Sequence, residues 1–297
     1  MRAWQVVALG LMLLIVFPSN TAAPVEELDV GFIVGGQWTN ASNSSTASDS
    51  FVDLPALVED YTATWCTNCV DVEHALNEIP SQYLQQYHFH RAIGETEDPF
   101  GSVALDERWE DRYGLRIPPT VVFNGYLKKI GSVADGESLK DDYDELTNST
   151  PPMDEGSTQF VWTPAGESGI VAWNVNISSN VLANYSLDVQ VWFVERGATF
   201  EEGSNQLGYY PHIVREIHSL GNATNGSETL PIPVAFDGDD VEVHLMYEFK
   251  PIVLEGCCDE PMISDDDSMD NPLPYLGLID IFAIIAIVVT LKFKRLL

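Results

Sequence analysis

The sequence predicts an exported, membrane-anchored chain with an α/β domain, an all-β sandwich and a C-terminal transmembrane helix. Strand-like and helix-like segments alternate over residues 51–146, which is typical of an α/β layer fold. β-rich runs separated by Gly, Asn, Asp and Ser follow over residues 159–249, with no helical pattern among them. Residues 273–291 are apolar apart from Asp280, and a segment of this length can cross a bilayer core.

The N-terminal segment predicts export. Arg2 precedes a short apolar run and a group of small residues, so residues 1–23 resemble a secretory signal cleaved near Ala22 or Ala23. An uncleaved anchor is the alternative, but the run is short for a membrane span. Residues 24–50 contain one strand-like patch at Val30–Val34, followed by a Ser/Thr-rich linker.

Residues 51–147 are predicted to form the α/β domain. Its first helix follows a strand and places Cys69, Val72, Leu76 and Ile79 on one face. The expected elements, in order, are strand Ala56–Ala63, helix Thr67–Ile79, strand Tyr87–Ile93, helix Phe100–Tyr113, strand Thr120–Asn124, its hairpin partner Leu127–Ser132 and helix Ser138–Leu146.

Residues 158–253 are predicted to form the sandwich, after a linker that contains Pro151 and Pro152. Its expected strands are Gln159–Trp162, Gly169–Ile177, Tyr185–Glu195, Ile213–Ile217, Leu230–Phe236 and Val241–Phe249. An acidic stalk, 254–272, then leads to the apolar segment 273–291 and to a basic tail, 292–297. Basic residues mark the cytoplasmic side of a span, so the preceding domains are expected outside the cytoplasm, or in the ER lumen of a eukaryote.

The charge of the chain restricts its partners. The net charge is −31, with 45 acidic and 14 basic residues, and such a surface repels nucleic acid. A high-salt habitat and an acidic secretory-pathway protein both explain this composition. Glycosylation of an exported surface is expected from the Asn-x-Ser/Thr sequons, which begin at Asn40, Asn43, Asn148, Asn176, Asn184, Asn222 and Asn225.

The sequence Trp65-Cys66-Thr67-Asn68-Cys69 lies between a predicted strand and a predicted helix. This context makes a Cys-x-x-Cys pair a redox candidate. Cys66 is placed at the helix N-terminus, where free amide groups and the helix dipole favour a thiolate. Cys69 falls on the apolar face. These positions predict that Cys66 attacks a disulfide and that Cys69 resolves the mixed disulfide.

Two segments, 56–69 and 113–125, resemble the active-site strand and the cis-proline motif of the thioredoxin family. The resemblance covers about 90 residues and implies two roles. Asp60 is the buried carboxylate that moves the proton at the resolving cysteine, and Pro119 is the cis-proline facing the dithiol. The alternative for Asp60 is a strand-end residue that faces water. Trp65, next to Cys66, is expected to shield one side of the motif. Thr67-Asn68 differs from the Gly-Pro and Gly-His of well-known members, so the direction of electron flow does not transfer.

A fainter resemblance lies in residues 191–195 and 210–215. They look like exported proteins in which a thioredoxin-like domain precedes an immunoglobulin-like one. The predicted fold class is therefore an α/β thioredoxin-like domain, an immunoglobulin-like β-sandwich and a single transmembrane helix.

Cys257 and Cys258 are adjacent in the stalk. Their Cα atoms lie ~3.8 Å apart, below the usual range for disulfides, so a bond between them is strained and easily reduced. Three interpretations stay open: a redox relay to the Cys66–Cys69 pair, a structural vicinal disulfide, and bridges to other chains.

The sequence thus predicts a membrane-anchored extracytoplasmic thiol-disulfide oxidoreductase acting on protein disulfides. Its redox group is the Cys66–Cys69 disulfide, with no other cofactor and no metal, and its electron donor or acceptor is not indicated. The alternative is a surface-exposed binding or adhesion glycoprotein that uses a redox-inert scaffold. Copper handling would need further soft ligands near the motif, and the sequence shows none there.

Overall fold

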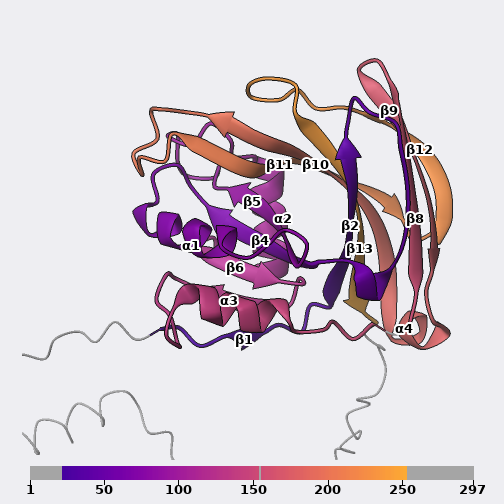
Figure 1. The fold of residues 1–297 in the computed structure, drawn as a ribbon, viewed down its shortest axis with the longest axis horizontal. Helices are drawn as coiled ribbons and strands as arrows, with labels where there is room; N and C mark the ends of the chain where they lie inside the picture. Colours follow the sequence, from indigo (N-terminus) through magenta and orange to yellow (C-terminus); the bar gives the residue numbers. More distant parts are fainter. Residues whose placement is uncertain (1–21, 154, 253–297) are drawn as a thin grey trace, which may run out of the picture. The chain divides into compact units, whose positions relative to one another are not determined.

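The computed structural model describes residues 22–153 and 155–252 (Figure 1). The strands are β1 Glu26–Glu27, β2 Phe32–Asn40, β3 Ser45–Ser50, β4 Ala56–Thr62, β5 Leu84–His90, β6 Thr120–Phe123, β7 Leu127–Ile130, β8 Ser157–Ala165, β9 Ser168–Asn176, β10 Tyr185–Thr199, β11 Tyr209–Gly221, β12 Asn225–Pro231 and β13 Val241–Pro251. The helices are η1 Phe51–Asp53, α1 Thr67–Asn77, α2 Val103–Tyr113, α3 Leu139–Thr147 and α4 Ser179–Asn184.

Nine strands form one sheet in the order β1-β7-β6-β4-β5-β11-β10-β13-β2. β4 runs parallel to β5 and antiparallel to β6, so its backbone is hydrogen-bonded on both sides. β5 also pairs in parallel with β11, with Ile213 opposite His88. This pairing joins the strands around α1 to the long hairpin β10–β11 in a single sheet.

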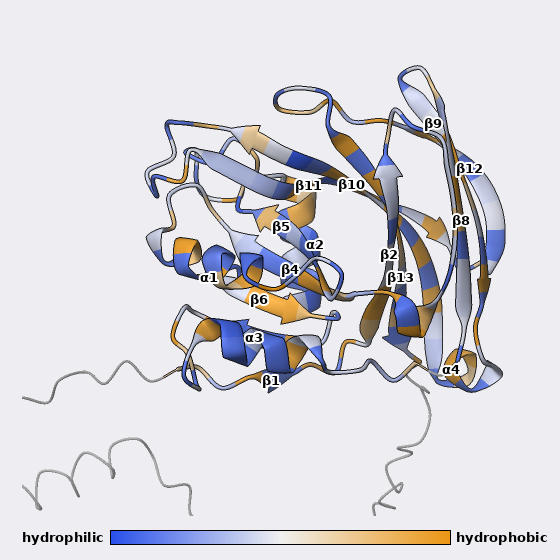
Figure 2. Ribbon diagram, viewed as in Figure 1, coloured by the Kyte–Doolittle hydropathy of each residue, from blue (hydrophilic) through white to orange (hydrophobic). Residues whose placement is uncertain are grey.

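The helices α1 and α3 cover the same face of the sheet at β4 and β6. Apolar residues from all four elements are buried together there, including Val58, Leu76, Phe123 and Tyr143. β6 is hydrophobic along its length, whereas α3 carries mainly hydrophilic residues (Figure 2). A helix with such a narrow apolar stripe depends on its packing partner, so α3 is stabilised mainly by this cluster.

The helix α2 packs on the opposite face. Trp109 lies against Tyr61 of β4 and Phe89 of β5, and the same cluster contains Ile33 of β2 and Trp192 of β10. The sheet therefore curves around α2 and brings strands from distant parts of the sequence to one helix. The amide of Ile33 also donates to the carbonyl of Asn124 in the β6–β7 turn, at 2.9 Å.

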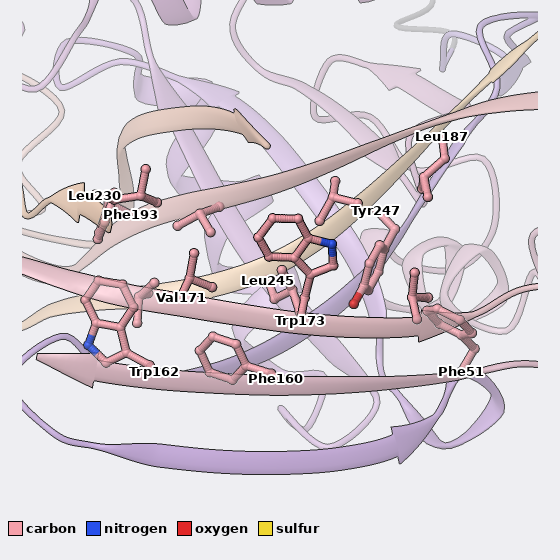
Figure 3. Close-up of a cluster of buried hydrophobic side chains, with 14 of the residues drawn as sticks. Phe51, Phe160, Trp162, Val171, Trp173, Leu187, Phe193, Leu230, Leu245 and Tyr247 are labelled. Atoms are coloured by element: carbon pink, nitrogen blue, oxygen red, sulfur yellow. The ribbon is translucent and has the colours of Figure 1, made fainter. Parts of the chain in front are cut away.

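A second sheet, with the order β12-β9-β8-β3, packs against β10, β13 and β2. Figure 3 shows the core between the sheets, in which the side chains drawn include Phe160, Trp162, Val171, Trp173, Leu187, Phe193, Leu245 and Tyr247. Trp162 is fully buried, and its indole N–H donates to the carbonyl of Ala41 at 2.8 Å. A large aromatic residue is thereby buried without leaving its polar group unpaired.

The predicted fold class is wrong. Strands make up 45% of the described residues and helices 17%, and the nine-stranded sheet runs from the elements around α1 into the strands of the sandwich. Residues 22–153 and 155–252 therefore do not divide into a self-contained α/β thioredoxin-like domain and a separate immunoglobulin-like sandwich. Residues predicted as a linker form β3 and the end of β2, and thus contribute to both sheets.

No helix within residues 22–153 and 155–252 is long and apolar enough to cross a membrane. Several predicted segments lie outside the described residues: the signal segment as far as residue 21, the stalk from residue 254 onward, the apolar segment 273–291 and the tail.

Candidate redox site

The Cys66–Cys69 disulfide lies at the start of α1, where the chain leaves the carboxyl end of β4 (Figure 1). A turn bonds the amide of Cys66 to the carbonyl of Ala63 at 2.9 Å. Cys66 is the N-cap of the helix, and its Sγ accepts the amide of Cys69 at 3.2 Å. The sulfur of Cys66 thus occupies the place of a capping oxygen, where backbone amides stabilise a negative charge.

The two cysteines differ in access to solvent. Cys66 is 5% exposed, whereas Cys69 is completely buried on the inner side of the helix. Thr67 and Asn68 between them are exposed, and Trp65 is half-buried beside the disulfide. An external sulfur atom therefore reaches Cys66 before Cys69, as the predicted roles require.

The loop after β5 fixes the residues that precede the motif. The carboxylate of Asp98 accepts the amide of Thr64 at 2.8 Å and lies 2.8 Å from Nδ1 of His90. Glu95 accepts the indole N–H of Trp65 at 2.6 Å. These bonds set the orientation of Trp65 against the disulfide.

The connection between β10 and β11, residues 200–208, covers the other side of the motif. The amide of Asn205 donates to the carbonyl of Thr64 at 3.0 Å, and its side-chain oxygen accepts the hydroxyl of Tyr210 at 2.6 Å. Gly203 is required here, because a Cβ would lie 2.0 Å from that hydroxyl and 3.1 Å from the Thr64 oxygen. A loop from the β-rich half is therefore bonded to the backbone just before the redox pair.

Pro119 is buried and lies directly before β6, which pairs with β4. The Pro118–Pro119 peptide bond is cis, as the resemblance implies. The preceding loop exposes two apolar side chains, Leu115 at 71% and Ile117 at 45%. Arg91 connects this loop to β4. Its backbone amide donates to the carbonyl of Thr62, and its guanidinium donates to the carbonyl of Arg116. The loop thus lies at the end of the sheet from which the Cys-x-x-Cys motif emerges.

The adjacent acidic residues of β4 have opposite environments. Glu59 faces α2, where Arg108 donates to its carboxylate at 2.7 Å and the hydroxyl of Tyr113 also donates to it. Asp60 faces α1, is completely buried, and finds no hydrogen-bond partner for either carboxylate oxygen among the described residues. Burial, and to a lesser extent the neighbouring Glu73, raise the pKa of Asp60 well above its usual range.

Glu73 and His88 lie next to Asp60. Oxygen atoms of the two carboxyls and a ring nitrogen of His88 are all within 4.8 Å of one another. Glu73 is one helical turn after Cys69, on the same face of α1, and it accepts the hydroxyl of Thr62 at 2.9 Å. Burial raises the pKa of Glu73 and lowers that of His88 well below its usual range. A neutral imidazole and two poorly compensated carboxyls therefore lie behind the buried cysteine.

The structure brings Cys66, Cys69, Trp65 and the end of β4 together, with Asp60 behind α1 and Pro119 at the same end of the sheet. Cys257 and Cys258 lie outside the described residues.

Sequence reasoning missed several neighbours of the disulfide. Glu73 looks like an ordinary surface residue of a helix, and the loop 200–208 is more than 130 residues from the motif. One signal was present for Glu73, because it follows Cys69 by four residues on the apolar face.

Comparison of the chain with family models, with curated protein sequences and with solved structures finds no match.

Proposed function

We propose that this protein is an extracytoplasmic thiol-disulfide oxidoreductase that acts on protein disulfides through Cys66 and Cys69. One observation supports this most strongly: Cys66 caps the N-terminus of α1 near the surface, and Cys69 is buried one turn further along. The apolar segment 273–291 attaches the protein to the membrane in this proposal, an inference from sequence alone.

In the reducing direction, the thiolate of Cys66 attacks one sulfur of a substrate disulfide. A bond forms between Cys66 and that sulfur, and the other substrate sulfur leaves as a thiolate. The thiolate of Cys69 then attacks the sulfur of Cys66, which releases the second substrate thiol and forms the Cys66–Cys69 disulfide. Two electrons pass from the dithiol to the substrate, and the oxidising direction is the reverse of these steps.

Asp60 handles the proton of Cys69 in this scheme. Cys69 has no access to bulk water, so its proton needs an acceptor inside the protein. A buried carboxyl with a raised pKa can accept and return a proton near neutral pH. Glu73 keeps the pKa of Asp60 high by adding a second negative charge to the same buried space.

The exposed side chains of Leu115 and Ile117 are the best candidates for contact with a peptide substrate. They lie on the loop that leads to Pro119, and partly unfolded proteins present apolar segments that such a surface can hold. The loop 200–208 is bonded to Thr64, two residues before Cys66, and is therefore a second surface that a bound substrate can meet.

The second candidate function is a binding or adhesion glycoprotein with an inert disulfide. The low exposure of Cys66 and the loop over the motif favour it, because structural disulfides are usually protected from exchange. The oxidoreductase proposal is favoured by the hydrogen bonds of the loop after β5 and of the loop 200–208, which go to Thr64 and Trp65 rather than to the sulfur atoms.

Trapping of substrates tests the proposal. The Cys69→Ser variant of the full chain should accumulate mixed disulfides with client proteins, because nothing remains to resolve them. They should disappear on reduction and be absent from the Cys66→Ser variant, whose remaining cysteine is buried. Both variants are made in a Cys257→Ser/Cys258→Ser background, which removes the stalk thiols. Equal trapping by both variants, or none by either, contradicts the proposal.

A further inference from the structure

The buried group formed by Asp60, Glu73 and His88 has a composition that the redox chemistry does not require. Thiol exchange needs one proton acceptor, but two carboxyls and an imidazole converge here from β4, α1 and β5. The three residues are between 0% and 3% exposed. Buried ionisable groups are costly unless something compensates them, so this concentration calls for an explanation.

The described part of the chain offers little compensation. Neither carboxyl forms an ion pair with a lysine or arginine there, in contrast to Glu59, which binds Arg108 on the other face of β4. Among the described residues neither buried oxygen of Asp60 has a hydrogen-bond partner. Thr62 donates to Glu73, and Nε2 of His88 lies 3.4 Å from the side-chain oxygen of Gln86. The ring of His212 lies 5.7 Å from that of His88.

The donor set matches a divalent transition cation. Carboxylate oxygens and a neutral imidazole nitrogen are ligands of zinc, manganese and ferrous iron, whereas calcium and magnesium prefer sets made of oxygen alone. Two carboxylates also supply the negative charge that balances the charge of the cation.

We infer that Asp60, Glu73 and His88 form a binding site for one divalent transition cation, with Zn²⁺ as its test ion. Ligands at ~2.0–2.2 Å from a tetrahedral zinc ion are about 3.4 Å apart. The present separations are all within 4.8 Å, so on binding they need to shorten by at most about 1.4 Å. A water molecule completes the coordination, as in zinc sites with three protein ligands.

The site is independent of the redox proposal, because cation binding needs no reaction at the cysteines. One consequence does rest on that proposal. A bound cation and a transferable proton exclude one another at Asp60, so the zinc-loaded protein should exchange disulfides more slowly than the metal-free protein.

Equilibrium dialysis of the full-length protein against Zn²⁺ tests the inference, since it allows for slow entry into a buried site. The protein is kept oxidised and carries Cys257→Ser and Cys258→Ser, so that no free thiol competes. The expected result is one zinc ion per chain, with affinity at least about 100-fold weaker in Asp60→Asn and His88→Gln. The matched controls Asp71→Asn and His74→Gln change an exposed carboxylate and an exposed imidazole of α1, and should bind as the parent does.

The absorption spectrum of bound Co²⁺ in the parent protein gives a second result that does not depend on the folding of any variant. Visible bands without intense charge transfer from sulfur are expected for nitrogen and oxygen ligands. The inference is overturned if the parent binds no zinc at micromolar concentrations, if Asp60→Asn and His88→Gln bind as tightly as the controls, or if a thiolate band dominates the spectrum. None of these results depends on redox activity, so the inference and the proposed function can fail separately.

Discussion

The ion pair between Arg112 of α2 and Glu248 of β13 connects two parts of the chain that the sequence predicts to be separate domains. Both side chains are almost fully buried, at 6% and 5% exposure, and Glu248 also accepts a hydrogen bond from Gln190 of β10. Breaking a buried ion pair by removing one charge typically costs about 3–5 kcal/mol. Glu248→Gln keeps the shape and one acceptor oxygen, so we expect a loss near the lower limit, about 3 kcal/mol.

The pH dependence of this loss follows from the pKa of Glu248. Burial raises that pKa, but Arg112, Arg108 and Lys250 together lower it by more, so the net shift is downward. A lowered pKa in the folded state means that the stabilisation is present above the unfolded value of ~4.3 and is lost as the pH falls through the folded value. Parent and variant should therefore differ fully at pH 7, and the difference should shrink progressively as the pH falls below the unfolded value of ~4.3.

Urea unfolding followed by tryptophan fluorescence and circular dichroism measures the effect. The urea midpoints from fluorescence and from circular dichroism should decrease by the same amount in the variant. We expect this because the nine-stranded sheet makes the described part of the chain one cooperative unit. Glu216→Gln is the control, since this carboxylate of β11 is exposed and pairs with His218 at the surface. A loss below about 1 kcal/mol, or two transitions of which only one responds, refutes the reasoning.

Three further predictions concern the redox site. Asp60→Asn should slow the reduction of a model disulfide by about 10²-fold, with exposed Asp71→Asn as the control, and equal rates for both variants contradict the proton role of Asp60. Gly203→Ala should lower the free energy of unfolding by about 1–3 kcal/mol and speed alkylation of reduced Cys66. The new Cβ would lie 2.0 Å from the hydroxyl of Tyr210, so the tyrosine has to move. Unchanged stability and alkylation would refute this. Replacing Leu115 and Ile117 by Ser should raise KM for an unfolded protein substrate but not for a small disulfide, and a parallel change in both excludes these residues as the peptide contact.

The local elements around the redox motif could be predicted from sequence because their signals are local. The strand expected over Ala56–Ala63 is β4, and the helix expected over Thr67–Ile79 is α1, which ends two residues earlier. Periodic apolar residues, an N-terminal cap and Pro80 are sufficient to define these two elements.

The arrangement of the sheets could not be predicted in the same way. β3 has the polar sequence Ser45-Thr-Ala-Ser-Asp-Ser50, which indicates a linker, yet it is the edge strand of the smaller sheet and pairs with β8. Polar residues suit an edge strand because one side faces water. The pairing of β5 with β11 joins residues more than 120 positions apart, and no local pattern encodes such a contact.

Only the part of the candidate site that is encoded in local motifs could be predicted from the sequence. The cysteines, Asp60 and Pro119 were found through two sequence motifs, whereas Glu73 and His88 acquire their significance only when the strands are paired. In β4, alternation places Glu59 and Asp60 on opposite faces. Only the structure shows that Arg108 pairs with Glu59, whereas no cation in the described part of the chain pairs with Asp60.

The reduction potential of the Cys66–Cys69 pair in the full-length protein tests the proposed function most directly. Equilibration with glutathione buffers, followed by alkylation and mass spectrometry, gives the fraction reduced at each potential. An exchanging redox site should lie between about −270 and −120 mV, the range of known disulfide oxidoreductases. A potential below about −300 mV, typical of structural disulfides, would contradict the oxidoreductase and support the binding glycoprotein.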